Sequence, residues 1–251
     1  MLVMGILNVT PDSFADGGKH NDFESAVARG LEMIAEGVDI IDIGGESTRP
    51  GADRVSEAEE IARTIPVIKE LAKHGVKISI DTMRASTAEA AITAGASIVN
   101  DVSGGLADPL MLQTVARLKV PYIAMHWRGQ SKVMNSKAIY GDVVSDVISE
   151  LQERIDAALD AGISTDNLIV DPGLGFAKDA DHNWAIIDAI DQFVSMGYPV
   201  LVGASRKRFL GGDSPDDREQ ATINLTKRLA PTGVWAVRVH SVKPHKEVLS
   251  A

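Results

Sequence analysis

The stretch Asp39-Ile-Ile-Asp-Ile-Gly-Gly-Glu-Ser-Thr-Arg-Pro-Gly-Ala52 decides the fold. Its first half is a short apolar run with two acidic residues, which is typical of a strand covered on both faces. At Gly44 and Gly45 the character changes, because a polar run follows and Pro50 with Gly51 prevents regular structure from continuing. The stretch therefore predicts a buried strand that delivers polar side chains to one end of the molecule.

The same unit recurs along the chain. Besides 39–45, the runs that predict strands are 2–8, 76–82, 97–103, 121–127, 167–173, 199–205 and 235–240. Apolar residues at helical spacing predict helices between them, from 23 to 37, after Ser56 and Ser86, and at 109–118, 143–161, 181–196 and 219–229. Ser56 to Glu59 and Ser86 to Glu89 have the pattern of capping boxes that open helices. The residues from Lys243 onward predict only a stub of helix.

Eight strands that alternate with seven full helices, without linker-like composition between them, predict one α/β domain over residues 1–251. The count favours a closed (β/α)8 TIM barrel, with its last helix cut short, over an open doubly wound sheet. No strand–turn–helix junction carries GxGxxG, which argues against dinucleotide binding.

Composition limits the classes of function. The 251 residues contain no Cys, which excludes disulfides and thiolate metal sites and favours a cytoplasmic location. No apolar run approaches the roughly 18 residues that span a bilayer, and no signal-peptide pattern is present, so we expect no membrane partner. A net charge of −10 and few aromatic residues argue against a nucleic-acid partner. A local arginine cluster can still bind an anionic small substrate.

Polar residues follow the predicted strands at the end where barrel enzymes place their chemistry. Any one of them has about even odds of being only a helix cap or turn former, and Asp101 with Ser103 fits that description well. All eight strand ends together are harder to explain that way, because buried charges are costly unless they are paired or functional. The strand ends offer Asn8, Thr48, Arg49, Asp81, Asn100, Asp101, His126, Asp171, Ser205, Arg206, Lys207, Arg238 and His240.

One set of these residues is suited to an anion. Asn8, Arg49, Arg238 and His240 belong to the first, second and eighth strands, which are neighbours once a barrel closes. Arginines bind phosphate or diphosphate with paired hydrogen bonds, and an Asn8 oxygen is a suitable ligand for a phosphate-bound Mg²⁺. Arg238 and His240 are two apart on one predicted strand, so we expect both side chains on the same side.

A second set is suited to a flat heterocycle. Asp81, Asn100, Asp171 and Lys207 supply two carboxylates, an amide and a cation, which match the edge of a ring with an amidine-like N–C–NH2 group. Asp171-Pro-Gly is also a good turn sequence. Lys207 lies between two arginines, so this segment also fits a solvated basic face.

Seven motifs, in order from Gly5 to His240, resemble those of the dihydropteroate synthases. The longest are MGILNVTPDSF at 4–14, DIGGESTRPG at 42–51 and DPGLGF at 171–176, and the others are IDT at 80–82, NDVSGG at 100–105, GASRK at 203–207 and RVH at 238–240. The variants at 80–84, 125–128 and 205–209 most resemble the actinobacterial branch of that family.

The resemblance implies a barrel enzyme of folate biosynthesis that uses Mg²⁺. It joins 6-hydroxymethyl-7,8-dihydropterin diphosphate to p-aminobenzoate, giving 7,8-dihydropteroate and pyrophosphate. Carried over by motif, the pterin-binding residues are Asp81, Asn100, Met125, Asp171, Gly203 and Lys207. The residues for the pyrophosphate and its metal are Asn8, Arg49, Arg238 and His240. The p-aminobenzoate pocket, where sulfonamides compete, is bordered by Thr48, Pro50, Phe176 and Lys207.

The resemblance also implies how the site works. Loops 10–19 and 47–54 are expected to fold over it during the reaction. We expect a dissociative substitution in which Asp81 and Asp171 stabilise an electron-poor pterin methylene, while Arg49 and Lys207 act with them as catalytic residues.

The chain departs from the family in two places, and two rival functions stay open. The family usually closes with a full helix that helps form a homodimer, whereas this sequence ends after a stub. The segment 211–218 is short and acidic. One rival is a non-catalytic homologue, against which the intact anion set argues. The other is a pterin-binding methyltransferase, and Arg49 with Arg238 favours a phosphorylated substrate instead. A purely structural role has a prior of a few per cent at most.

Overall fold

A computed structural model describes residues 1–10, 18–46, 54–130 and 134–250. In these residues eight strands form one parallel sheet: β1 (Leu2–Asn8), β2 (Ile40–Gly44), β3 (Lys77–Asp81), β4 (Ile98–Asp101), β5 (Tyr122–Met125), β6 (Leu168–Asp171), β7 (Leu201–Val202) and β8 (Ala236–Val239). Their order is β6-β5-β4-β3-β2-β1-β8-β7. A bridge between Val170 and Val200 joins the two outer strands and closes the ring, which confirms the predicted (β/α)8 TIM barrel.

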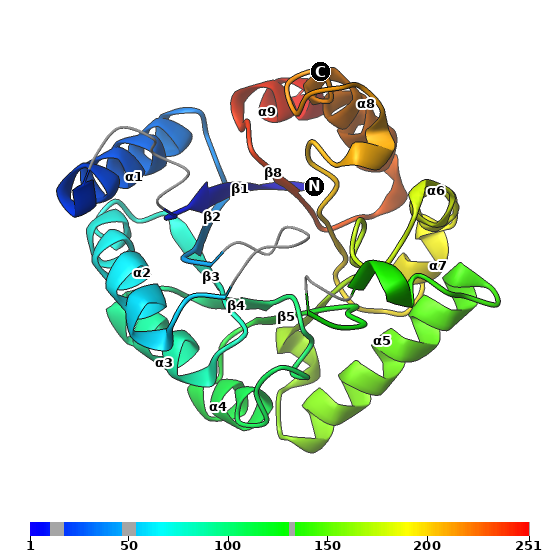
Figure 1. Ribbon diagram of the computed structural model, residues 1–251, viewed down its shortest axis with the longest axis horizontal. Coiled ribbons are helices and arrows are strands. Elements are labelled where there is room, and N and C mark those ends of the chain that lie inside the picture. The colour runs from blue at the N-terminus through cyan, green and yellow to red at the C-terminus, as the bar shows by residue number, and fades with distance from the viewer. Residues whose placement is uncertain (11–17, 47–53, 131–133, 251) are drawn as a thin grey trace.

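Helices surround the sheet on the outside, as Figure 1 shows. In the described residues they are α1 (Gly18–Ala35), α2 (Glu57–Ala72), α3 (Ala85–Ala94), α4 (Met111–Leu118), α5 (Val143–Asp160), α6 (Ala180–Asp188), α7 (Ile190–Val194), α8 (Glu219–Leu229) and α9 (Lys243–Ser250). None of them is both long and apolar enough to cross a membrane. The predicted stub is the eight-residue α9, which packs beside α8.

The prediction of one helix over 181–196 is wrong. The chain leaves helical geometry at Ala189, where φ is −102° and ψ is 20°. The turn separates α6 from α7 and lets Ile190 and Phe193 bury their side chains in the core. Tertiary packing outweighs helical periodicity here.

An apolar floor inside the barrel fixes where the polar residues point. Met4, Ile40, Ile98, Ile123, Ile169, Leu201 and Ala236 form one buried cluster, separate from the core between sheet and helices. Because side chains alternate along a strand, the residue two positions later faces the same interior, nearer the carboxyl end. Asn100, Asp171 and Arg238 each follow a floor residue in this way. The strand alternation therefore places them above the floor, at one end of the barrel.

Only one of the two predicted capping sites is found. The Ser56 hydroxyl accepts a bond from the Glu59 N–H at 3.3 Å and so caps α2. Ser86 does not cap α3, because that helix begins at Ala85. Asp108 does so instead, with one carboxylate oxygen 2.8 Å from the Ala85 nitrogen and the other 2.9 Å from the Leu110 nitrogen. The cap comes from a different loop, which local spacing cannot reveal.

Asp108→Ala should lower the free energy of unfolding by about 1 kcal/mol, because it leaves two backbone N–H groups without this acceptor. For a chain of this size that corresponds to a fall in melting temperature of about 2–4 °C. Thermal unfolding followed by circular dichroism measures it, with the exposed Asp213→Ala as control. Equal melting temperatures for the two variants would contradict the assignment.

Candidate active site

The strand register brings most of the predicted site residues to one level of the barrel. Asn8 pairs with Gly44, Gly44 with Asp81, and Asp81 with Asn100. On the other side of the barrel Met125 pairs with Asp171. Because all eight strands are parallel, these residues share the carboxyl end of the barrel, as predicted.

Arg238 connects two acidic residues from neighbouring strands. Its Nε lies 2.6 Å from Asp42 Oδ2, and its Nη2 lies 2.7 Å from Asp81 Oδ2. Asn100 also donates to Asp42 Oδ2, at 3.0 Å. Arg238, which belongs to the set predicted for the anion, therefore contacts Asp81, which belongs to the set predicted for the heterocycle.

Asp42 is a residue of this cluster that the sequence analysis missed. It is fully buried, and its Oδ1 has no hydrogen-bond partner among the described residues. A carboxylate in the middle of an apolar strand was the available signal, because such a charge is costly without a partner. Its partner Arg238 lies 196 residues later, which no local pattern indicates.

Asp171, Gly203 and Lys207 form the opposite side of the site. Asp171 Oδ1 accepts the Gly173 N–H at 2.7 Å. A side chain at Gly203 would place its Cβ 3.7 Å from Asp171 Oδ2 and 4.0 Å from the Arg238 Cβ, so Gly203 keeps open the space between them. Lys207 Nζ donates to the Leu174 carbonyl.

An apolar cluster lies beside these polar residues. Met125 forms a buried cluster with Met83 and Val102, and Phe176 packs against that cluster. Lys207 Nζ lies 4.6 Å from the centre of the Phe176 ring, in a cation–π contact. The two described residues predicted for p-aminobenzoate therefore lie together.

Burial brings the ionisable groups of the site toward neutrality. It raises the pKa of Asp81 to about 7, with Arg238 opposing the shift and Asp42 adding to it. It also raises the pKa of Asp171, against the bond from Gly173 and the charge of Lys207. Burial lowers the pKa of Lys207 to about 8, with Asp171 opposing. Shifted pKa values of this kind are common where chemistry takes place.

The raised pKa of Asp81 predicts a pH dependence of stability. The folded chain binds this proton more tightly than the unfolded chain between the ordinary value of 3.8 and about 7. The contribution to the free energy of unfolding is therefore full below pH 3.8 and is lost as the pH rises through 7. Urea unfolding should show wild type losing about 1 kcal/mol per pH unit relative to Asp81→Asn between pH 5 and 7. If the free energy of unfolding of wild type relative to Asp81→Asn stays constant or increases between pH 5 and 7, this pKa is contradicted.

Other polar strand ends face away from the cavity. Asp101 accepts bonds from the Ser103 N–H, the Ser103 hydroxyl, the Gly105 N–H and the Tyr122 hydroxyl, which confirms it as a turn former. His126 is buried beside Glu150 of α5, and Arg206 pairs with Glu219 of α8.

His240 lies just beyond β8, which ends at Val239, so the prediction that it continues the strand with Arg238 is wrong. The His240 N–H donates to Ser205 Oγ at 3.2 Å, in the loop after β7. The imidazole Nδ1 lies 2.9 Å from the same Oγ. His240 therefore stays at the rim, fixed to the loop after β7.

Three predicted site residues lie outside the described residues: Thr48, Arg49 and Pro50. Most of the two predicted loops, 10–19 and 47–54, lies outside them as well. The flanks of 47–53 are described. Arg84 bonds to Glu46, to Glu60 and to the Val55 carbonyl, and Arg54 Nε lies 2.9 Å from Glu46 Oε1. A charged cluster thus holds both flanks of that segment together.

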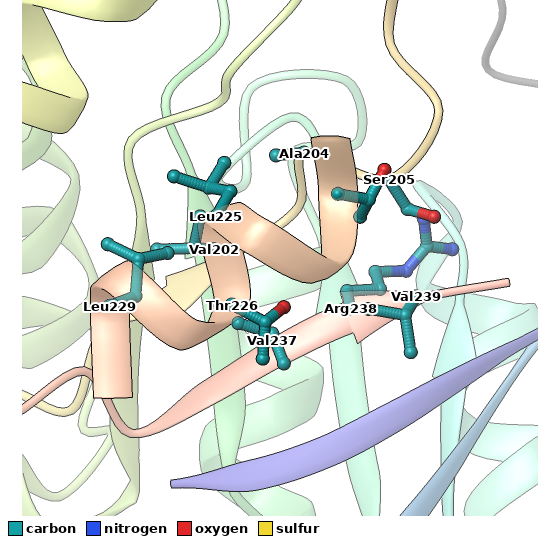
Figure 2. Close-up of a pocket in the computed structure, with 10 residues that line it drawn as sticks. Val202, Ala204, Ser205, Leu225, Thr226, Leu229, Val237, Arg238 and Val239 are labelled. Carbon is teal, nitrogen blue, oxygen red and sulfur yellow. The ribbon is translucent and has the colours of Figure 1, made fainter. Parts of the chain in front are cut away.

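The described residues also line two cavities. One, between α8 and the strands β7 and β8, has a volume of about 10 Å³ and is too small for a ring, with Ser205 and Arg238 at one end (Figure 2). The other is an open hollow of about 440 Å³ beside Trp127 and Arg128. None of the predicted site residues that the structure describes lines the second one.

A buried, charged recognition site at the strand ends of a TIM barrel defines an enzyme that binds a small polar ligand. The family model described as pterin binding enzyme matches residues 4–240. The dihydropteroate synthase of Mycobacterium leprae is 49% identical, over 98% of this chain and 90% of the relative. The chain therefore belongs to the pterin-binding enzymes and, within them, to the dihydropteroate synthase family of folate-biosynthesis transferases.

Solved structures agree with that placement. The Xanthomonas albilineans dihydropteroate synthase with 4-aminobenzoic acid has a TM-score of 0.93 and 42% identity, over 99% of this chain and 90% of that one. The same enzyme with 7,8-dihydropteroate gives 0.90 and 39%, over 99% and 91%. The Yersinia pestis dihydropteroate synthase with a sulfonamide drug complex gives 0.93 and 38%, over 99% and 92%.

Proposed function

We propose that this chain condenses 6-hydroxymethyl-7,8-dihydropterin diphosphate with p-aminobenzoate, giving 7,8-dihydropteroate and pyrophosphate. The observation that carries the proposal is the grouping of Asp81, Asn100, Asp171, Lys207 and Arg238 at the carboxyl end of one barrel. Relatives solved with 4-aminobenzoic acid and with 7,8-dihydropteroate support the choice of substrates.

The pterin ring has complementary partners in this cavity. A carboxylate accepts two parallel N–H bonds from an amidine edge, one on each oxygen. Asp171 Oδ1 accepts the Gly173 N–H and has a second lone pair, so both oxygens of Asp171 can serve this purpose. The Asn100 amide nitrogen is bonded to Asp42, so its oxygen is the group left to face a ring N–H. Met125 supplies an apolar surface for the ring face.

The diphosphate would lie toward the β1 and β8 side, where Asn8, Arg238 and His240 stand, with Arg49 joining them. Mg²⁺, when bound with the diphosphate, supplies positive charge that offsets the charge of the leaving group. Within the described ranges no three His, Cys, Asp or Glu side chains are grouped to hold a metal. In this proposal the ion is held mainly by substrate oxygens, with the Asn8 amide oxygen as its protein ligand.

The reaction would be a dissociative substitution. The bond between the pterin methylene carbon and the diphosphate oxygen breaks, and pyrophosphate leaves with the electron pair. The buried carboxylates of Asp81 and Asp171 stabilise the electron-poor methylene. The aniline nitrogen, held in place by Phe176 and Lys207, then forms the new C–N bond and releases its proton to water. A sulfonamide, as in the Yersinia pestis complex, would compete for this second position.

Product analysis tests the proposal. The purified protein is incubated with both substrates and Mg²⁺, and pyrophosphate and 7,8-dihydropteroate are quantified. We expect equal amounts of the two products and inhibition by a sulfonamide. Pterin binding without pyrophosphate release would instead identify a non-catalytic homologue.

A further inference from the structure

A buried lysine behind the active site contacts none of the predicted substrate-binding side chains. Lys178 Nζ lies 2.8 Å from His126 Nδ1 and 3.1 Å from the carbonyl oxygens of both Gly173 and Phe176. Lys178 is only 8% exposed. A protonated lysine has three N–H donors and no acceptor, so these three contacts use all of them.

The contact fixes the state of the neighbouring histidine. Because a protonated Lys178 can only donate, His126 Nδ1 then accepts, and the imidazole proton is on Nε2. That nitrogen lies 2.9 Å from Glu150 Oε2. Burial lowers the pKa of His126 to about 4, which agrees with a neutral ring. The chain Lys178–His126–Glu150 therefore joins the loop after β6 to α5, and Arg128 holds Glu150 at its far end.

The loop between β6 and α6 needs such support. Gly173, Gly175 and Ala177 have φ angles of 68°, 77° and 49°. Ala177 is in the left-handed region that favours glycine, at a cost of about 1 kcal/mol. Its carbonyl accepts the Tyr140 hydroxyl at 2.9 Å, while Lys178 holds two further carbonyls of the same loop. The Tyr140 side chain, from outside the loop, and the Lys178 side chain, from within it, thus maintain its shape.

The same loop carries the active site. It begins at Asp171, whose carbonyl accepts the His126 N–H at 2.9 Å. The Leu174 carbonyl of this loop accepts a hydrogen bond from the Lys207 ammonium, and the Phe176 ring of the loop lies beside the same ammonium. A shift of this loop would move Phe176 and Lys207 together, whereas Asp81 and Asn100 stand on other strands.

We propose that Lys178 is a positioning residue for the second substrate: with His126 and Glu150 it holds the β6–α6 loop in the shape that places Phe176 and Lys207 against p-aminobenzoate. The inference rests on the proposed function. Burial lowers the pKa of Lys178 to about 7, so kinetics are compared at one fixed pH of 6.5.

The test is a split between the two substrates. Lys178→Met removes the donors at similar length, and Glu150→Gln weakens the far end of the chain without touching the loop. We expect the KM for p-aminobenzoate to rise about tenfold or more in the first and about threefold in the second. The Kd for the pterin, measured by calorimetry, should rise by a smaller factor than the KM for p-aminobenzoate, because Lys207 serves both substrates while Asp81 and Asn100 stand on other strands. Lys69→Met, an exposed lysine on α2, is the matched control.

The possible results distinguish the positioning role of Lys178 from the proposed function. An unchanged KM for p-aminobenzoate, or equal losses for both substrates, would overturn the positioning role. If Lys178→Met does not fold, the KM of Glu150→Gln for p-aminobenzoate tests the positioning role. An inactive wild type would overturn the proposed function, and calorimetric binding of p-aminobenzoate to wild type and the variants would still test Lys178.

Discussion

Lys207→Ala should lower kcat/KM about 10³-fold, close to 4 kcal/mol of transition-state stabilisation. The buried ammonium contacts the Leu174 carbonyl and the Phe176 ring, and Asp171 raises its pKa against the effect of burial. One group would therefore serve both substrates, by donating to the pterin and by positioning p-aminobenzoate. Removing a charged, buried donor costs more than removing a neutral one.

The neighbour Arg208 is the matched control for this variant. It is exposed, and it represents the alternative that this basic segment is only a solvated surface. Steady-state kinetics of Arg208→Ala should stay within about twofold of wild type. Similar losses in both variants would favour the surface interpretation and remove Lys207 from the site.

Asp171→Asn should reduce kcat about 10³-fold and weaken pterin binding about 100-fold. An asparagine Oδ1 can still accept the Gly173 N–H, so the turn is kept while the charge near the pterin methylene is lost. The effect then reports on recognition and electrostatic stabilisation rather than on folding. Single-turnover kinetics and calorimetry measure the two parts separately.

Asp181→Asn controls for the loss of an acidic residue. Asp181 is exposed in the first turn of α6, ten residues from Asp171. Its variant should match wild type in both assays. Turnover of Asp171→Asn within threefold of wild type would contradict a catalytic role for that carboxylate.

The barrel and its polar end could be predicted from the sequence because both follow from local patterns. Strand alternation puts Asn100, Asp171 and Arg238 two residues beyond Ile98, Ile169 and Ala236, on the same inner face. The local pattern of each strand therefore predicts which of its side chains face the barrel interior. A helical crossover between successive parallel strands brings these side chains to one end.

The remaining features depend on contacts between distant parts of the chain. The cap of α3 comes from Asp108, and Asp42 finds Arg238 in another strand, so neither has a signature at fixed spacing. The break at Ala189 follows from core packing of α7. Cytoplasmic location, Mg²⁺, the homodimer, the actinobacterial likeness and the roles of all the site residues remain predictions, and Thr48, Arg49 and Pro50 also lie outside the described residues.

Arg238 changes how the two predicted sets are related. The sequence assigned it to the diphosphate, whereas the structure pairs it with Asp42 and Asp81. A guanidinium that touches Asp81 stands where the ring and the diphosphate would meet. The residues predicted for the pterin and those predicted for the anion are therefore in contact through Arg238 and Asp81.

A crystal structure with 6-hydroxymethyl-7,8-dihydropterin diphosphate tests the central claim most directly. We predict the ring between Asp81, Asn100, Asp171 and Lys207, with the diphosphate directed toward Asn8 and Arg238. Density for the ring outside the barrel mouth, or for a diphosphate directed away from β1 and β8, would contradict the account.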